Sequence, residues 1–370
     1  MHHAHAGLKT PEYYVPGLPA DYVAQRYGIP FADIAKLGSA ENPHGASSLA
    51  TEAVREHLNA LHLYPSWTAD PLREKIAETY GFDPSEVICG AGETEILSLI
   101  TRGFCPPGDK IQMPGPCFPI YHLFAEAEGR IPVLVHGATD RQSMALNVEA
   151  YIAAIEPETR IVYITNPHSP SGTWLDESEV RRIVEASAHA LVVLDEAYVH
   201  YSDTPGYIHL AAEYENLAVL RTFSKAFGLA GLRIGFGVAR RPIIDTLLAV
   251  KPTWNMGQLQ IVGGVAALDD DEHVERTIQT IVKNREYVQG RFQELDRFRM
   301  VGGSRSNFFL VELLDPDIDS TGVFLGLLER GVVVKDGSVS FRGLDDRFLR
   351  CDVNLQPHMD RLIDALADLS

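Results

Sequence analysis

The chain has 370 residues, of which 45% are hydrophobic and 22% charged, and its formal net charge is −18. This length allows one large domain or two unequal ones, and such an acidic surface argues against nucleic acid and anionic lipid as partners. No run of about 18 apolar residues exists, so the sequence predicts no membrane span. The cysteines are far apart and show no metal-ligand spacing, which predicts a reduced, cytoplasmic protein without a metal site; they are Cys89, Cys105, Cys117 and Cys351.

The first 45 residues contain many prolines and glycines, and they are predicted to form an N-terminal arm that wraps around a large domain or completes a small one. The large domain is expected over residues 46–250. Short apolar runs alternate there with amphipathic stretches. The runs are the predicted strands, at residues 87–89, 110–113, 131–135, 160–165, 190–194, 217–221 and 234–238.

These predicted strands are mostly apolar throughout, as are strands buried on both faces of a parallel sheet. Helical patterns lie between them at residues 93–102, 118–128 and 177–188. The alternation predicts an α/β domain with helices on both faces of the sheet. Residues 251–370 are predicted to form a smaller α+β domain, with long helices over 258–296, strands at 308–313, 331–334 and 348–353, and helices at 323–330 and 357–369.

Four segments stand at the ends of predicted strands, where open α/β sheets bind their ligands. The first, residues 90–95 (GAGETE), opens a helix whose exposed backbone N–H groups suit a phosphate. A plain glycine turn capped by Thr94 is the structural alternative. The second, residues 166–172 (NPHSPSG), is an irregular loop fixed by two prolines, and it could equally be a simple strand-to-helix connection.

The third segment is residues 195–198 (DEAY), which follow a very apolar predicted strand. A carboxylate that emerges from a buried strand needs a partner, because its burial is otherwise costly. A protonated ring nitrogen would be such a partner for Asp195, whereas the structural alternative is a helix cap.

The fourth segment, residues 222–235 (TFSKAFGLAGLRIG), carries the strongest signal. Lys225 lies among apolar neighbours, which lower the pKa of a lysine and allow it to form a Schiff base. Thr222, Ser224 and Arg233 could hold a dianionic phosphate. The alternative is a lysine whose tip reaches solvent.

In this order the four segments resemble those of fold-type I pyridoxal-phosphate (PLP) enzymes of the aspartate aminotransferase superfamily, and within it the histidinol-phosphate aminotransferases. The resemblance extends from residues 41–45 (ENPHG) to the C-terminal helix. It implies a large PLP-binding α/β domain with a mainly parallel central sheet plus a smaller α+β domain. It also implies amino-group transfer from an L-amino acid or a histidinol-phosphate-like amino-alcohol phosphate to an oxo acid such as 2-oxoglutarate.

The resemblance implies that Lys225 carries PLP and then moves the substrate proton, that Asp195 keeps the ring nitrogen protonated, and that Tyr198 donates to the cofactor's phenolic oxygen. It implies that Phe118 stacks on the ring and that Ser169 lies beside it. The phosphate would be bound by Gly92, Glu93, Thr94, Thr222, Ser224 and Arg233.

Other matches concern the substrate and a second subunit. Tyr64 matches a tyrosine that reaches the phosphate of the neighbouring subunit, which implies a homodimer with shared active sites. Arg350 matches the arginine that binds the substrate carboxylate as a bidentate fork. Lys335 and Asn42 are also expected at the substrate.

Three positions depart from the family pattern. Ser169 stands where the family has an asparagine that donates to the phenolic oxygen, so we expect a weaker contact there. Phe118 replaces a tyrosine, which preserves stacking but loses a hydroxyl. Lys335 replaces the arginine that binds the substrate phosphate, which puts histidinol phosphate in doubt as the substrate.

Two other kinds of function stay open. Residues 90–95 and 343–345 also resemble threonine-phosphate decarboxylases, although the second arginine of that family is Asn354 here. An eliminating or cyclising PLP enzyme of secondary metabolism is a further alternative, because Ser169 and Phe118 fall next to the ring. A non-enzymatic regulator is disfavoured, since the chain has no spare length for a DNA-binding module and its charge is acidic.

Overall fold

The computed structural model describes residues 17–136 and 143–369, so the first sixteen residues of the predicted arm lie outside the described residues. A seven-stranded sheet has the order β2-β8-β7-β6-β5-β3-β4. Its strands are β2 (Val87–Ala91), β3 (Lys110–Gly115), β4 (Ile131–His136), β5 (Thr159–Thr165), β6 (Leu191–Asp195), β7 (Leu217–Thr222) and β8 (Ile234–Ala239). Strands β3 to β7 pair in parallel, and β8 is antiparallel to both of its neighbours. The prediction of an α/β fold with a mainly parallel sheet is confirmed.

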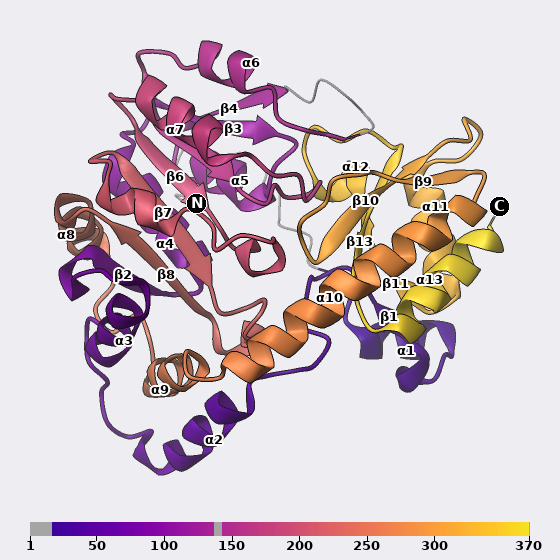
Figure 1. The fold of residues 1–370 in the computed structure, drawn as a ribbon, viewed down its shortest axis with the longest axis horizontal. Helices are drawn as coiled ribbons and strands as arrows, with labels where there is room; N and C mark the ends of the chain where they lie inside the picture. Colours follow the sequence, from indigo (N-terminus) through magenta and orange to yellow (C-terminus); the bar gives the residue numbers. More distant parts are fainter. Residues whose placement is uncertain (1–16, 137–142, 370) are drawn as a thin grey trace, which may run out of the picture.

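Helices cover both faces of this sheet (Figure 1). One face packs against α4 (Glu93–Phe104), α5 (Pro119–Ala127) and α8 (Arg241–Val250). The other packs against α3 (Asp70–Tyr80), α6 (Val148–Ala153) and α7 (Glu177–Ala186).

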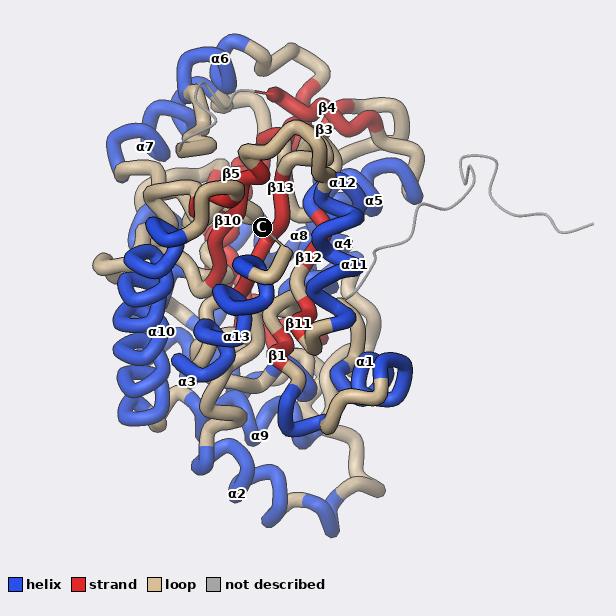
Figure 2. Tube along the Cα trace, turned by 90° about the vertical axis from the view of Figure 1, so that its right-hand side faces the viewer, coloured by secondary structure: helices blue, strands red, loops and turns tan. Residues whose placement is uncertain are grey.

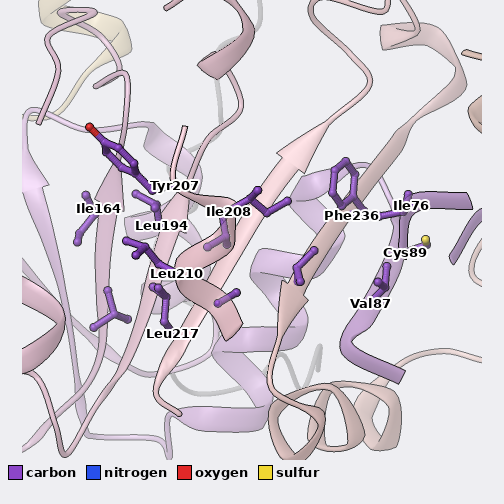
Figure 3. Packing of buried hydrophobic residues seen from close by; sticks show 14 of the residues in the cluster. Ile76, Val87, Cys89, Ile164, Leu194, Tyr207, Ile208, Leu210, Leu217 and Phe236 are labelled. Atoms are coloured by element: carbon purple, nitrogen blue, oxygen red, sulfur yellow. The ribbon is translucent and has the colours of Figure 1, made fainter. Parts of the chain in front are cut away.

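The strands are apolar throughout because both of their faces are buried. In β5, Val162 and Ile164 belong to the core cluster on one side of the sheet, whereas Ile161 and Tyr163 belong to the cluster on the other. Figure 3 shows part of the first cluster, in which Ile164, Leu194 and Phe236 of three strands are buried together with Ile76 of α3.

A second sheet has four antiparallel strands in the order β12-β13-β10-β9. They are β9 (Phe298–Met300), β10 (Phe308–Leu313), β12 (Lys335–Asp336) and β13 (Phe348–Asp352). Figures 1 and 2 show this sheet beside α10 (Asp271–Arg291), α11 (Ser320–Glu329) and α13 (Gln356–Ala367). Strand β9 was not among the predicted strands, because three residues at a sheet edge give little pattern.

The N-terminal part of the described chain joins the C-terminal part through β1 (Ala35–Lys36), which pairs in parallel with β11 (Val332–Val333). The remaining helices are α1 (Ala20–Tyr27), α2 (Ser48–Glu56), α9 (Gln258–Ala267) and α12 (Gly337–Ser340). The division of the chain at residues 45 and 250 stays a prediction. Across residues 17–136 and 143–369, none of the helices combines the length and apolarity that crossing a membrane requires.

Candidate active site

A pocket of about 430 Å³ opens between the carboxyl ends of β5, β6 and β7 and the strands β12 and β13. Twelve of the predicted site residues line it, which are Glu93, Thr94, Phe118, Ser169, Asp195, Tyr198, Thr222, Ser224, Lys225, Arg233, Lys335 and Arg350. The position agrees with the rule that open α/β sheets bind ligands beyond the carboxyl ends of their strands.

Lys225 follows β7, and its Nζ donates to the backbone oxygen of Ser39 at 3.1 Å. The same atom lies 5.2 Å from the centre of the Tyr198 ring. Burial, assisted by the positive charge of Arg350, lowers the pKa of Lys225 to about 8. The side chain therefore has a substantial neutral, nucleophilic fraction near neutral pH.

Asp195 ends β6 and is held by two donors. The Ala197 amide donates to Oδ1 at 3.0 Å, and the Tyr121 hydroxyl donates to Oδ2. Burial raises the pKa of this carboxyl, while the bonds from Tyr121 and Ala197 act in the opposite direction. A cationic ring nitrogen is the kind of partner that such a desolvated carboxylate favours.

A tight cradle surrounds the N-terminus of α4. A Cβ atom at Gly92 would lie 2.3 Å from Nη2 of Arg233, and one at Gly235 would lie 2.2 Å from the Glu93 amide nitrogen. Gly92 also has a φ of 79°, which disfavours other residues. Helix N–H groups, the Arg233 guanidinium and the hydroxyls of Thr222 and Ser224, which are 3.1 Å apart, suit a dianionic phosphate.

Ser169 and Phe118 lie on two loops that His168 ties together. His168 Nε2 donates to the Pro116 oxygen at 2.9 Å, and its Nδ1 accepts from the Ser171 hydroxyl at 2.8 Å. Burial lowers the pKa of His168 to about 4, so the imidazole stays neutral and keeps this tautomer. His168 thus braces the loops that carry Ser169 and Phe118.

Arg350 and Lys335 form the opposite wall and face each other across paired strands. Arg350 Nη2 donates to Asp352 Oδ1 at 3.2 Å, and the guanidinium lies 4.7 Å from the centre of the Phe308 ring. Burial and the charge of Arg350 lower the pKa of Lys335 to about 8. Two desolvated cations next to each other suit an anionic group of a ligand.

Three predicted site residues lie outside the pocket lining. Gly92 borders it as the cap of α4. Asn42 donates from Nδ2 to the Ala226 oxygen at 2.8 Å and so anchors the loop of Lys225, and its contact with the substrate stays a prediction. Tyr64 is 79% exposed and stacks on Trp254 at 4.5 Å.

Sequence reasoning missed Tyr121, because its bond to Asp195 joins residues 74 positions apart. A signal was nevertheless present, since a buried carboxylate needs a donor and Tyr121 lies one helical turn beyond Phe118. Glu93 was predicted at the phosphate, but the position of its side chain in the pocket, where the charge of Asp195 raises its pKa, was not.

The pocket fits PLP in three separate ways. The cradle at α4 fits its phosphate, and Asp195 fits its ring nitrogen. Between them, the hydroxyl of Ser169 is buried and has no hydrogen-bond partner among the described residues, so it can meet a polar atom of a bound ring. Together with the neutral fraction of Lys225, these features define a PLP-dependent enzyme of the aminotransferase fold.

Comparison with known proteins identifies the family. Residues 32–366 match the family model "Aminotransferase class I and II", and the chain belongs to this family. It is 33% identical to histidinol-phosphate aminotransferase of Methanothermobacter thermautotrophicus over 97% of this chain and 95% of the relative. It is 36% identical to the enzyme of that name from Geobacillus sp. over 96% and 95%.

A solved structure shows the same fold. The histidinol-phosphate aminotransferase of Sinorhizobium meliloti, in complex with pyridoxal-5′-phosphate, superposes with a TM-score of 0.85 at 22% identity over 100% of this chain and 99% of that one. The protein is therefore a PLP-dependent aminotransferase.

Proposed function

We propose that the protein moves an amino group from a donor with an acidic group to an oxo acid such as 2-oxoglutarate, with Lys225 as the cofactor lysine. The observation that carries the proposal is the position of Lys225. Its amine donates to Ser39 O in a pocket between the phosphate cradle and Arg350, and burial lowers its pKa to about 8. Bound PLP supplies an electron sink for the pair of electrons that the substrate Cα–H bond leaves.

Side chains of the pocket have separate roles around the bound cofactor. Asp195, braced by Tyr121, holds a proton on the ring nitrogen. With the cofactor bound, the amine of Lys225 would take the proton from the substrate Cα and return one to the cofactor carbon, because this amine lines the pocket beside Tyr198 and burial lowers its pKa to about 8. Phe118 and the loop braced by His168 fix the ring plane and limit water.

Arg350 and Lys335 support a substrate with a carboxylate or phosphate. Relatives of this chain are named for histidinol phosphate, and an amino-alcohol phosphate is one of the acidic donors that these two side chains could bind. The Lys335 ammonium binds a phosphate as a point charge, without the bidentate geometry of a guanidinium. This favours binding of several kinds of acidic group on the substrate. Asn354 precedes α13 and accepts through Oδ1 from the Leu355 amide at 2.7 Å, and it offers no second cation for a decarboxylase.

We further propose a homodimer with shared active sites, located in the cytoplasm. Large apolar side chains are exposed along residues 58–67 and at the stacked Trp254, namely Leu58, Leu61, Leu63, Tyr64 and Trp67. An apolar patch of this kind favours a protein partner, and a second copy would place Tyr64 of each subunit near the other pocket. Four unpaired cysteines agree with a reducing compartment.

Borohydride reduction of the yellow protein tests the assignment of the lysine, because it fixes the cofactor to the residue that carries it. Peptide mass mapping should find the label on Lys225. A label on Lys335 would refute the proposed arrangement, since Lys335 is the other lysine that lines the pocket.

A further inference from the structure

Glu93 places a second carboxyl in the pocket, beside Asp195. It is the first residue of α4 and is 8% exposed. Glu93 and Asp195 line the same pocket, close enough for the charge of Asp195 to raise the pKa of Glu93. Oε1 of Glu93 is buried, and across the described residues it has no hydrogen-bond partner.

Two carboxylates this close in a desolvated site cannot both carry a charge, so the pair holds one proton. Burial and the neighbouring charge of Asp195 raise the pKa of Glu93 well above its usual value, which agrees with a pair that holds one proton. The other groups facing the pair are Lys225, Tyr121 and Arg233. Neither Arg233 nor Tyr121 takes that proton in place of the carboxyls, because a guanidinium has only donors and the Tyr121 hydroxyl already donates to Asp195. Lys225, whose pKa is about 8, can exchange protons itself, so the test below is repeated without its amine.

We propose that Glu93 is a positioning residue that stores a proton for the ring nitrogen of PLP. The proposal rests on the proposed function, in which Asp195 pairs with that nitrogen. In the cofactor-free protein Glu93 and Asp195 share one proton. When the cofactor binds, the O–H bond of the pair breaks, an N–H bond forms on the ring, and two carboxylates then face one pyridinium.

The consequence is a difference in proton uptake. The native protein supplies the ring proton from within, so cofactor binding draws little from solvent. A protein without the Glu93 carboxyl must take that proton from the buffer. Each unit of rising pH should then lower its cofactor affinity by about tenfold more than it lowers the affinity of the native protein.

The test is calorimetric titration of the cofactor-free, full-length chain with pyridoxamine 5′-phosphate, which forms no bond to Lys225. Titrations in two buffers of different ionisation enthalpy count the protons taken up, at a pH above the pKa of the ring nitrogen in water. The variants are Glu93→Gln and, should that fold poorly, Glu93→Ser. Glu78→Gln is the matched control, since Glu78 is an exposed carboxylate of α3. Repeating the pair in Lys225→Ala removes the titration of the lysine.

We expect Glu93→Gln to take up about one proton more than the native protein, and Glu78→Gln to match the native protein. Equal proton uptake in Glu93→Gln and native protein, with binding intact in both, would overturn the inference and leave the proposed function standing. A native chain that does not bind pyridoxamine 5′-phosphate at all would overturn the proposed site and this inference with it.

Discussion

Arg350→Lys tests how the substrate's acidic group is bound. The Arg350 guanidinium donates from Nη2 to Asp352 Oδ1 at 3.2 Å and to the Gly38 oxygen at 3.3 Å, and it lies 4.7 and 5.4 Å from the ring centres of Phe308 and Phe341. Its Nε is buried and has no hydrogen-bond partner among the described residues, so it can donate to a ligand. A lysine keeps the charge but loses the planar fork and the stacking.

The loss can be estimated from these contacts. One hydrogen bond between charged groups contributes about 1.5–3 kcal/mol. Because about 1.4 kcal/mol is a factor of ten, KM for an acidic donor should rise roughly ten- to a hundredfold in Arg350→Lys, with a smaller change in kcat.

Steady-state kinetics with two donors measures this effect. One donor carries a carboxylate or phosphate, and the other is the matching amine without it, for which KM should not change. Arg347→Lys is the control, since the Arg347 guanidinium donates to backbone oxygens of Leu313 and Ile318 away from the pocket. An unchanged KM for the acidic donor, or an equal rise for both donors, would refute the role given to Arg350.

Three further predictions concern the cofactor and the fold. Reconstitution of cofactor-free protein with PLP should accelerate about tenfold per pH unit below the Lys225 pKa of about 8 and level off above it, because burial makes the amine neutral there; a flat stopped-flow profile, or one that falls with pH, would contradict this. Ser169→Asn should shift the absorption titration of the bound cofactor by adding a donor where a hydroxyl stands without a partner, and superimposable titrations would count against it. Glu196→Ala should cost about 3–5 kcal/mol in the free energy of unfolding measured by urea, since it leaves the buried Arg221 without the carboxylate at 2.7 Å; a loss under about 1 kcal/mol would contradict the argument.

Much of the large sheet could be predicted because its strands are buried on both faces and therefore apolar throughout. The run at residues 160–165 corresponds to β5 within one residue, and the segment after it carries Ser169 as expected. The site was predictable for a related reason. Parallel strands end at one edge, so segments that follow separate strands meet there, as Asp195 and Lys225 do.

What could not be predicted depends on contacts between distant segments. The register that sets Lys335 opposite Arg350 comes from strand pairing, which the hydrophobic pattern does not fix for a strand of two residues. The bond from Tyr121 to Asp195 and the reach of the Glu93 side chain depend on how α4 and α5 pack against the sheet. Asn42 shows the opposite case. Its motif, residues 41–45, is recognisable in the sequence, but the sequence did not predict that Asn42 contacts the backbone of the loop that carries Lys225.

The most direct test of the central claim is the absorption spectrum of the purified protein during stepwise addition of amino donors and then of 2-oxoglutarate, with the products identified. Transamination predicts a yellow protein that bleaches with one acidic donor, releases its oxo acid, and regains its colour when the oxo acid acceptor is added, while Lys225→Ala does not complete this cycle. A yellow protein that releases carbon dioxide or water instead, or one that bleaches without forming an oxo acid, would contradict it.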